Sequence, residues 1–279
     1  MKRFLISVVV VAFLAAAATV AWREFGDQAA KLLPDECLAQ VDNGTNDLKA
    51  RVNPEQARNA ALIASISIKR GLPARAATIA LATAYQESKL YNIDYGDRDS
   101  VGLFQQRPSQ GWGSRTQLLN TTYATNAFYD ALIKIDGYET MEITVAAQKV
   151  QRSAFPDAYA DHEPGARALA SSLTGQSAAA FSCRFGSIKV GTVGTVRDRI
   201  VSAFGAAAGT PVITGHAITV SPGKSTTGWA IAQWAVAYAN RLGVASVAYD
   251  GHRWSGDEGW KSSSTAGDQL VVTVKQSEK

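Results

Sequence analysis

Tyr85-Gln86-Glu87-Ser88-Lys89-Leu90 and Gly102-Leu103-Phe104-Gln105-Gln106-Arg107-Pro108 are the two stretches of sequence that decide the fold. The first closes an apolar segment that Pro73 opens, and its periodicity predicts a helix that ends at Glu87 and Ser88. The second lies within residues 91–113, which are rich in Gly, Asp and Pro and therefore predict irregular backbone with short hairpins. We expect a helix end to face this irregular segment.

Glu87 is the candidate acid of the site. Leu90, Leu103 and Phe104 are expected to form an apolar wall beside it, and burial against such a wall raises the pKa of a carboxyl. The partial negative charge at a helix C-terminus acts in the same direction. Glu87 is therefore predicted to stay protonated close to neutral pH, as a general acid requires.

Helical patterns lie on both sides of these stretches. Asn53, Pro54 and Gln56 form the signature of a helix start, and the pattern runs to Gly71. Three further helices are predicted at residues 121–135, 142–153 and 158–174, and helix is expected to dominate up to Cys183. Residues 42–52 are polar and predict a linker or loop.

The composition changes after Cys183. The chain becomes rich in Gly, Ala, Val and Thr, with a short helix predicted at residues 196–204, a longer one at 228–242, and strands at 211–220, 244–249 and 270–274. The predicted organisation is a signal-anchor or signal peptide at 1–22, a linker at 23–51, a mainly α domain with a small irregular or β region at 52–183, a linker with a short helix at 184–210, and a small α+β domain at 211–279.

The N-terminus predicts export. Lys2 and Arg3 precede a run from Phe4 to Trp22 that carries no charged residue. As a helix this run spans about 28 Å, close to the bilayer's hydrocarbon thickness of about 30 Å. An uncleaved anchor and a cleaved signal both remain open, and in either case the rest of the chain is expected outside the membrane. The net charge of +4 includes no basic block, so nucleic acid is not an expected partner.

Cys37 and Cys183 are the two cysteines of the chain. Outside the membrane, the simplest prediction is a disulfide that links the entry of the helical domain to its exit. The alternative is a pair of buried free thiols.

The two opening stretches resemble the lysozyme-like superfamily of goose-type lysozymes and soluble lytic transglycosylases, over about residues 52–183. Together with Gly111-Trp112-Gly113 and Val150-Gln151-Arg152-Ser153-Ala154-Phe155-Pro156, they look like an actinobacterial membrane-anchored group of this kind. The resemblance implies cleavage of peptidoglycan glycan strands, with Glu87 as the catalytic acid, Ser88 orienting it or contacting substrate, and Gly102 and Gln105 lining the cleft. No cofactor is expected.

One motif of the resembled superfamily is absent. Many transglycosylases carry Ala-Tyr-Asn on a later helix, where this chain reads Ala147-Gln148-Lys149-Val150-Gln151. The partner that this motif supplies is either missing or replaced by Gln148, Gln151 or Tyr159. Its absence favours a second hypothesis, a non-catalytic peptidoglycan-binding or scaffold protein.

The reaction type depends on a second carboxylate. A retaining hydrolase needs one about 5–5.5 Å from the acid, and the candidates are Asp94, Asp97 and Asp99. A lytic transglycosylase needs Glu87 alone, which is the case if these aspartates are turn residues. Trp112 and Tyr91 are candidates for stacking on sugar rings or for the core.

The last part of the chain has a fainter resemblance to zinc D-Ala-D-Ala peptidases. The positions where that family carries metal ligands hold Thr219, Gln269 and Val271. The resemblance therefore implies no zinc chemistry. A non-catalytic domain is expected, with Trp229 and Trp234 in its core and Trp254 and Trp260 either in the core or facing sugar.

Overall fold

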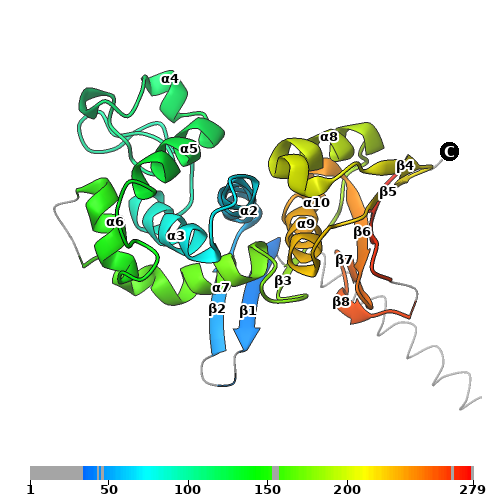
Figure 1. Cartoon of the computed structure of the whole chain (residues 1–279). Coiled ribbons are helices and arrows are strands. Elements are labelled where there is room, and N and C mark those ends of the chain that lie inside the picture. The colour runs from blue at the N-terminus through cyan, green and yellow to red at the C-terminus, as the bar shows by residue number, and fades with distance from the viewer. Residues whose placement is uncertain (1–33, 43, 45–46, 153–156, 265–266, 278–279) are drawn as a thin grey trace, which may run out of the picture.

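The computed structural model describes residues 34–42, 44, 47–152, 157–264 and 267–277. A helical region at residues 54–173 is followed by a region with a six-stranded antiparallel sheet and helices (Figure 1). This confirms the predicted order of a mainly helical part and a mixed part. The predicted membrane segment lies outside the described residues, and within them no helix has the length and apolar character to span a bilayer.

Helix α2 (Pro54–Lys69) begins as the sequence predicts. The Asn53 side chain accepts from the backbone N–H groups of Glu55 and Gln56, and the Gln56 side chain accepts from the Asn53 N–H, which completes a capping box. The helix stops before Gly71, whose φ of 68° suits a residue without a side chain. The cap signals therefore fixed both ends of α2.

The other predicted helices of this region are also present. They are α3 (Ala74–Ser88), α5 (Thr121–Leu132), α6 (Ile143–Gln151) and α7 (Glu163–Leu173). Residues 91–113 are irregular as predicted, with an isolated bridge between Val101 and Gln106 and a short 3-10 helix, η1 (Pro108–Gln110). The short helix α4 (Arg115–Leu118) follows, and a second 3-10 turn, η2 (Ala160–His162), leads into α7.

Part of the predicted linker is wrong, because it forms a sheet. Strands β1 (Glu36–Asp42) and β2 (Asp47–Val52) make a hairpin, and β1 also pairs with β3 (Phe181–Arg184), where helix was expected to continue. One face of this hairpin is buried, and both strands contact α7. The partner strand β3 is remote in sequence, so local composition could not show the pairing.

Cys37 and Cys183 form a disulfide, which confirms the prediction. They lie directly opposite each other on the neighbouring strands β1 and β3. Both side chains are buried in the core. The bond therefore joins the start of the described chain to the segment that follows the last helix of the helical region.

The C-terminal sheet has the order β4-β5-β9-β6-β7-β8. The expected strand at 211–220 is instead a hairpin, β4 (Val212–Thr214) and β5 (Ala217–Val220), because Gly215 and His216 make the turn. Strands β6 (Val244–Tyr249) and β9 (Leu270–Val274) confirm the prediction. The hairpin of β7 (His252–Ser255) and β8 (Gly259–Ser262) was not predicted, since its short polar strands lack a clear alternation.

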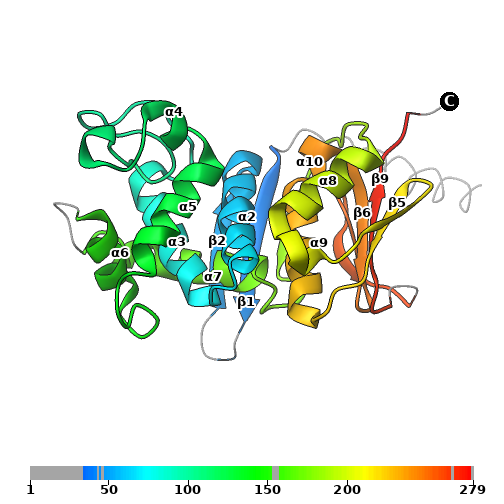
Figure 2. The ribbon, with the colours of Figure 1, turned by 45° about the horizontal axis from the view of Figure 1, so that its top comes forward.

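Helix α9 (Ser225–Ala237) lies between the sheet and the helical region (Figure 2). It contacts β6 and β9 on one side and α2 and α7 on the other, and its last ten residues, 228–237, are all buried. A short helix, α10 (Ala239–Leu242), continues it. The core position predicted for Trp229 and Trp234 is confirmed; Trp254 is also buried, and Trp260 is partly buried against this core.

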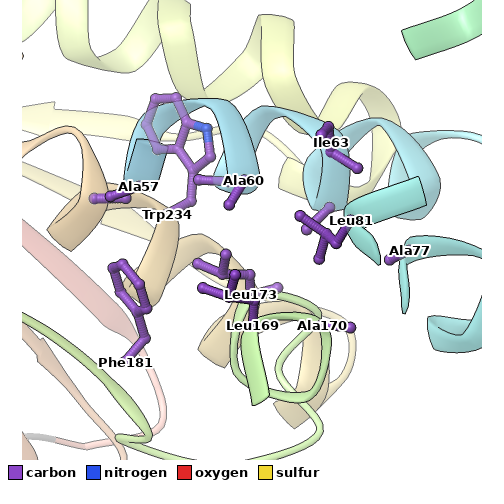
Figure 3. Close-up of a cluster of buried hydrophobic side chains, with 14 of the residues drawn as sticks. Ala57, Ala60, Ile63, Ala77, Leu81, Leu169, Ala170, Leu173, Phe181 and Trp234 are labelled. Atoms are coloured by element: carbon purple, nitrogen blue, oxygen red, sulfur yellow. The ribbon is translucent and has the colours of Figure 1, made fainter. Parts of the chain in front are cut away.

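One hydrophobic core runs through both regions. Figure 3 shows Ile63 of α2, Leu81 of α3, Leu169 of α7, Phe181 of β3 and Trp234 of α9 gathered in this core. Residues 184–210 join it as well, because α8 (Val193–Phe204) buries three hydrophobic side chains against α2 and α9 before a 3-10 turn, η3 (Gly205–Ala208): Val196, Ile200 and Phe204. The helix expected there is confirmed, but the segment is a packed element of the core.

Candidate active site

Glu87 lies on the last turn of α3, where the chain reverses sharply. Lys89 and Leu90 both adopt the left-handed conformation, with φ of 53° and 62°. The Leu90 N–H donates to the Ala84 carbonyl, and the Leu90 side chain is fully buried. The turn ends the helix without a glycine and leaves Glu87 partly buried beside the irregular segment.

Two side chains from later in the chain hold the Glu87 carboxylate. Tyr159 Oη donates to Glu87 Oε1 over 2.8 Å, and the Gln151 side chain also hydrogen-bonds this carboxyl. Gln151 Nε2 donates to the Phe104 carbonyl oxygen over 2.7 Å as well. The end of α6, the turn before η2 and the irregular segment therefore meet at Glu87.

Burial raises the pKa of Glu87 above its usual value. The hydrogen bonds from Tyr159 and Gln151 favour the ionised form and offset part of this shift. The expected elevation of the pKa is thus present, and Leu90, Leu103 and Phe104 are all buried as the apolar wall requires. A carboxyl in this state can donate a proton and can also be stabilised after losing it.

Ser88 and Gly102 build the turn beside Glu87. The Ser88 side chain is buried, and its Oγ lies 2.8 Å from the Leu103 carbonyl and 3.0 Å from the Ala84 carbonyl. Of the two roles considered for Ser88, this geometry fits orientation of the helix end. Gly102 has a φ of 80°, and a Cβ there would lie 2.5 Å from the Leu118 carbonyl oxygen, so the position requires glycine.

Gln105 lines the same cleft as Glu87. It is a non-glycine residue with a φ of 46°, and its Nε2 is 3.2 Å from the Gly102 carbonyl and 3.3 Å from the Tyr95 carbonyl. Backbone in this region is rare outside glycine and is held by its surroundings. The side chain of Gln105 thus closes the loop while presenting an amide to the cleft.

The cleft around Glu87 has a volume of about 500 Å³, and we call it the acid compartment. It is lined by residues of the irregular segment and of the end of α6, including Asp97, Arg98, Gln105, Gln110, Trp112, Gln151 and Arg152. A second cleft of about 640 Å³, which we call the basic compartment, shares Gln110, Trp112, Gln151 and Arg152 with it. The two compartments adjoin each other at these four residues, and we call them together the groove.

The three candidate aspartates differ in their exposure and in the hydrogen bonds that their carboxylates accept. Asp99 accepts hydrogen bonds from Arg107 Nε at 2.9 Å and from the Ser109 backbone N–H at 2.7 Å, and Arg107 holds the pKa of this carboxyl well below its usual range. Asp97 lines the acid compartment with its side chain 90% exposed. Asp94 is exposed near Arg115. Asp99 therefore braces the loop, as the turn interpretation predicts.

The two aromatic candidates, Trp112 and Tyr91, lie in different surroundings. Trp112 lines both compartments and packs partly against the core. Tyr91 accepts a hydrogen bond from the Asn53 side chain, which caps α2. Trp112 therefore lines the groove, whereas Tyr91 links the irregular segment to the start of α2.

Among the residues of the acid compartment that the sequence did not single out are Arg98, Arg107, Gln110 and Arg152. Gln110 directly precedes a quoted motif and Arg152 lies within another, but neither motif showed that these side chains would line the groove. The Asp99–Arg107 pair had a local signal, since the two residues flank the irregular turn. Charge pairing across that turn was the clue available.

The described residues contain no group of three or more His, Cys, Asp or Glu side chains that could hold a metal ion. Thr219 lies opposite Val271 in the pairing of β5 with β9, and Gln269 Nε2 is 3.4 Å from Ser221 Oγ. His252 Nδ1 is 2.8 Å from the Asp250 carbonyl. The absence of metal in the C-terminal region stays a prediction that rests on the chemistry of these side chains.

Comparison with known proteins informs the C-terminal region. A family model described as the C-terminal domain of VldE matches residues 184–271, which include α8, all the helices after it and most of the six-stranded sheet. No lysozyme-like family was identified, and no curated protein matches the chain. The match begins well before residue 211, in the segment that packs into the core through α8. The C-terminal part of this chain is thus similar to the C-terminal domain of VldE.

Proposed function

We propose that this protein cleaves the glycan strands of peptidoglycan between N-acetylmuramic acid and N-acetylglucosamine, as a lytic transglycosylase on a lysozyme-like helical scaffold. The observation that carries the proposal is Glu87, a partly buried carboxyl with a raised pKa that opens into an extended groove. The sequence resemblance of the two stretches around Glu87 and Gln105 supports the same activity.

Glu87 acts twice in the proposed reaction. It first donates its proton to the glycosidic oxygen, and the bond between that oxygen and C1 of the muramic acid breaks. The 6-hydroxyl oxygen of the same sugar then bonds to C1, and its proton returns to the Glu87 carboxylate. The products are a 1,6-anhydro sugar and a free hydroxyl on the leaving sugar, and no water is consumed.

The hydrogen bonds of Tyr159 and Gln151 fit this cycle. Between the two proton transfers Glu87 is an anion, and both side chains hydrogen-bond it in that state. They occupy the role that the absent Ala-Tyr-Asn motif was expected to supply. Of the three suggested replacements, these two contact Glu87, which supports an enzyme over a non-catalytic binder.

The aspartates support a single-carboxylate mechanism. Asp99 is held by Arg107 and Ser109, and Asp97 extends into solvent with its side chain 90% exposed. A nucleophilic carboxylate of a retaining hydrolase is instead positioned tightly beside the acid. We therefore propose transglycosylation over hydrolysis.

The proposed place of action is the outer face of a cell membrane. Disulfides persist in oxidising compartments, and Cys37 and Cys183 are paired. We propose that the N-terminal segment tethers the chain by a single span or directs its secretion. Peptidoglycan strands are the proposed partner, and no nucleic acid is proposed.

Product analysis tests the reaction directly. Incubating purified peptidoglycan with the protein is expected to release muropeptides that end in 1,6-anhydromuramic acid, which mass spectrometry distinguishes from hydrolysed products by the missing mass of one water. Products with reducing ends would replace the transglycosylase by a hydrolase. Binding to peptidoglycan without any product would favour the non-catalytic alternative.

Replacing Tyr159 by Phe is expected to move the alkaline limb of the pH profile of kcat/KM to higher pH. The Tyr159 hydroxyl stabilises the Glu87 carboxylate, so its removal raises the pKa of Glu87 and keeps the acid protonated at higher pH. Loss of positioning is expected to lower kcat/KM at the optimum by about 10–100-fold.

Tyr238→Phe is the matched control for this change. The Tyr238 hydroxyl donates to the Arg58 carbonyl and is remote from the groove, so its removal should leave the pH profile in place. A Tyr159→Phe profile that falls in rate but keeps its alkaline limb would show that Tyr159 does not act on the proton of Glu87.

A further inference from the structure

The basic compartment extends the groove away from Glu87. It shares Gln110, Trp112, Gln151 and Arg152 with the acid compartment, and Lys134 and Lys149 line it beyond them. A strand that lies in the acid compartment with its scissile bond at Glu87 therefore continues past Trp112 into this space. The compartment is part of the substrate path of the proposed function.

The charged side chains that line the basic compartment are all cations. Lys134 follows α5, Lys149 lies near the end of α6, and Arg152 directly follows α6. All three are exposed, none forms an ion pair within the described part of the chain, and the described lining of the compartment includes no carboxylate. By contrast, Arg107 in the acid compartment is neutralised by Asp99. Three cations that converge on one cavity are an electrostatic site for an anion.

We propose that Lys134, Lys149 and Arg152 bind the carboxylates of the stem peptides that muramic acid residues carry, so that the protein selects peptide-bearing strands. This inference rests on the proposed function. The sugar rings and their N-acetyl groups are uncharged, so they give no reason for a cationic wall. The lactyl group of each muramic acid links it to a peptide that ends in a carboxylate, and this charge recurs along the strand beside the groove.

The test measures binding, so that it does not depend on cleavage. The full-length protein with Glu87→Gln is tested with two probes: soluble glycan strands with their stem peptides, and the same strands after the peptides are removed and the lactyl carboxylates left behind are converted to neutral amides. Both are freed of phosphate-bearing wall polymers. Adding Lys134→Gln, Lys149→Gln and Arg152→Gln together is expected to raise the Kd for peptide-bearing strands about tenfold, which corresponds to three exposed charge contacts. Their affinity for peptide-free strands should not change.

A charge-matched control separates local contacts from net charge. Lys189→Gln, Arg253→Gln and Lys261→Gln remove the same charge from exposed positions in the C-terminal region, and should leave both Kd values unchanged. Added salt should reduce the preference for peptide-bearing strands, because exposed charge contacts are screened.

Three outcomes would overturn the inference. An equal loss of affinity for both strands would mean that the cations contact sugar, and no loss would mean that they contact neither. With a third probe, peptide-free strands that retain their phosphate-bearing polymers, a loss of affinity on the triple substitution that peptide-bearing strands do not share would assign the site to phosphate. Failure to cleave any strand would refute the proposed reaction alone, because the binding of the Glu87→Gln protein is measured independently.

Discussion

The Glu87→Gln variant is expected to cleave peptidoglycan at least about a thousandfold more slowly than the parent protein. Gln has the shape of Glu and can still accept a hydrogen bond from Tyr159, but it has no proton of suitable acidity to give to the leaving oxygen. The substitution therefore removes the chemistry and retains the geometry. The rate of release of soluble muropeptides at the pH optimum measures the effect.

Stability and binding measurements show whether the loss is chemical. Burial raises the pKa of Glu87, so folding disfavours its ionised form, and neutral Gln should keep or slightly raise the free energy of unfolding at neutral pH. The sign follows from linkage, since a raised folded-state pKa gives stability that is lost as pH rises through it. Glu139→Gln, at an exposed position, is the matched control and should retain full activity. A Glu87→Gln protein that digests wall at the parental rate would exclude Glu87 as the acid.

Most of the helical region could be predicted from short stretches of the sequence. The capping box at Asn53 and the glycine at position 71 bound α2 correctly, and Glu87 was correctly placed on the last turn of α3. Each of these features depends on residues within one or two turns of chain. Side-chain periodicity and cap chemistry are physical properties of the segment itself, so they can be read without knowledge of the fold.

The pairing of strands that lie far apart in the sequence could not be predicted. Strand β1 lies between β2 and β3, and its pairing with β3 joins residues far apart in the chain. Strand β2 is buried through its contact with α7, and this contact cannot be seen in the local sequence. The polar sequence of β2 therefore predicted a loop. The hairpin β7–β8 was missed for a related reason, because Trp254 and Trp260 face each other only once the sheet has formed.

The candidate site was likewise predicted where it depends on local motifs and missed where it depends on packing between elements. Glu87, Gly102 and Gln105 belong to local motifs, and the structure brings them to one loop system. Tyr159 and Gln151 were named among possible replacements for an absent motif, but their hydrogen bonds to Glu87 depend on how α6 and η2 pack against α3. The basic compartment had no sequence signal, since Lys134, Lys149 and Arg152 meet across two helices.

The C-terminal region supports the helical region through buried polar contacts as well as apolar ones. Gln233 of α9 is fully buried, and its Oε1 accepts from the Phe181 N–H at 2.7 Å. Its Nε2 donates to the carbonyls of Ser172 and Ser177. One side chain thus connects α9 to β3 and to the end of α7. Gln233 lies within residues 184–271, the part of the chain that is similar to the C-terminal domain of VldE, so this part braces the helical region.

The second large effect is expected from replacing both Cys37 and Cys183 by Ala. The disulfide closes a loop with a sequence separation of 146 residues. In the chain-entropy model such a closure stabilises the folded state by about 5 kcal/mol, because it restricts the unfolded chain. The free energy of unfolding should fall by about that amount. Ala is apolar, so it adds no unsatisfied hydroxyl at these buried positions, as Ser would.

Equilibrium denaturation gives the measurement, and reduction of the parent protein gives the control. The reduced parent and the Cys37→Ala/Cys183→Ala variant should unfold at similar denaturant concentrations, both well below the oxidised parent. The bond joins β1 to β3, and no residue of either strand lines the groove, so the Kd for glycan strands should change little while the fold persists. A loss of stability below about 1 kcal/mol would contradict this account and would indicate that residual structure in the unfolded protein already keeps Cys37 close to Cys183.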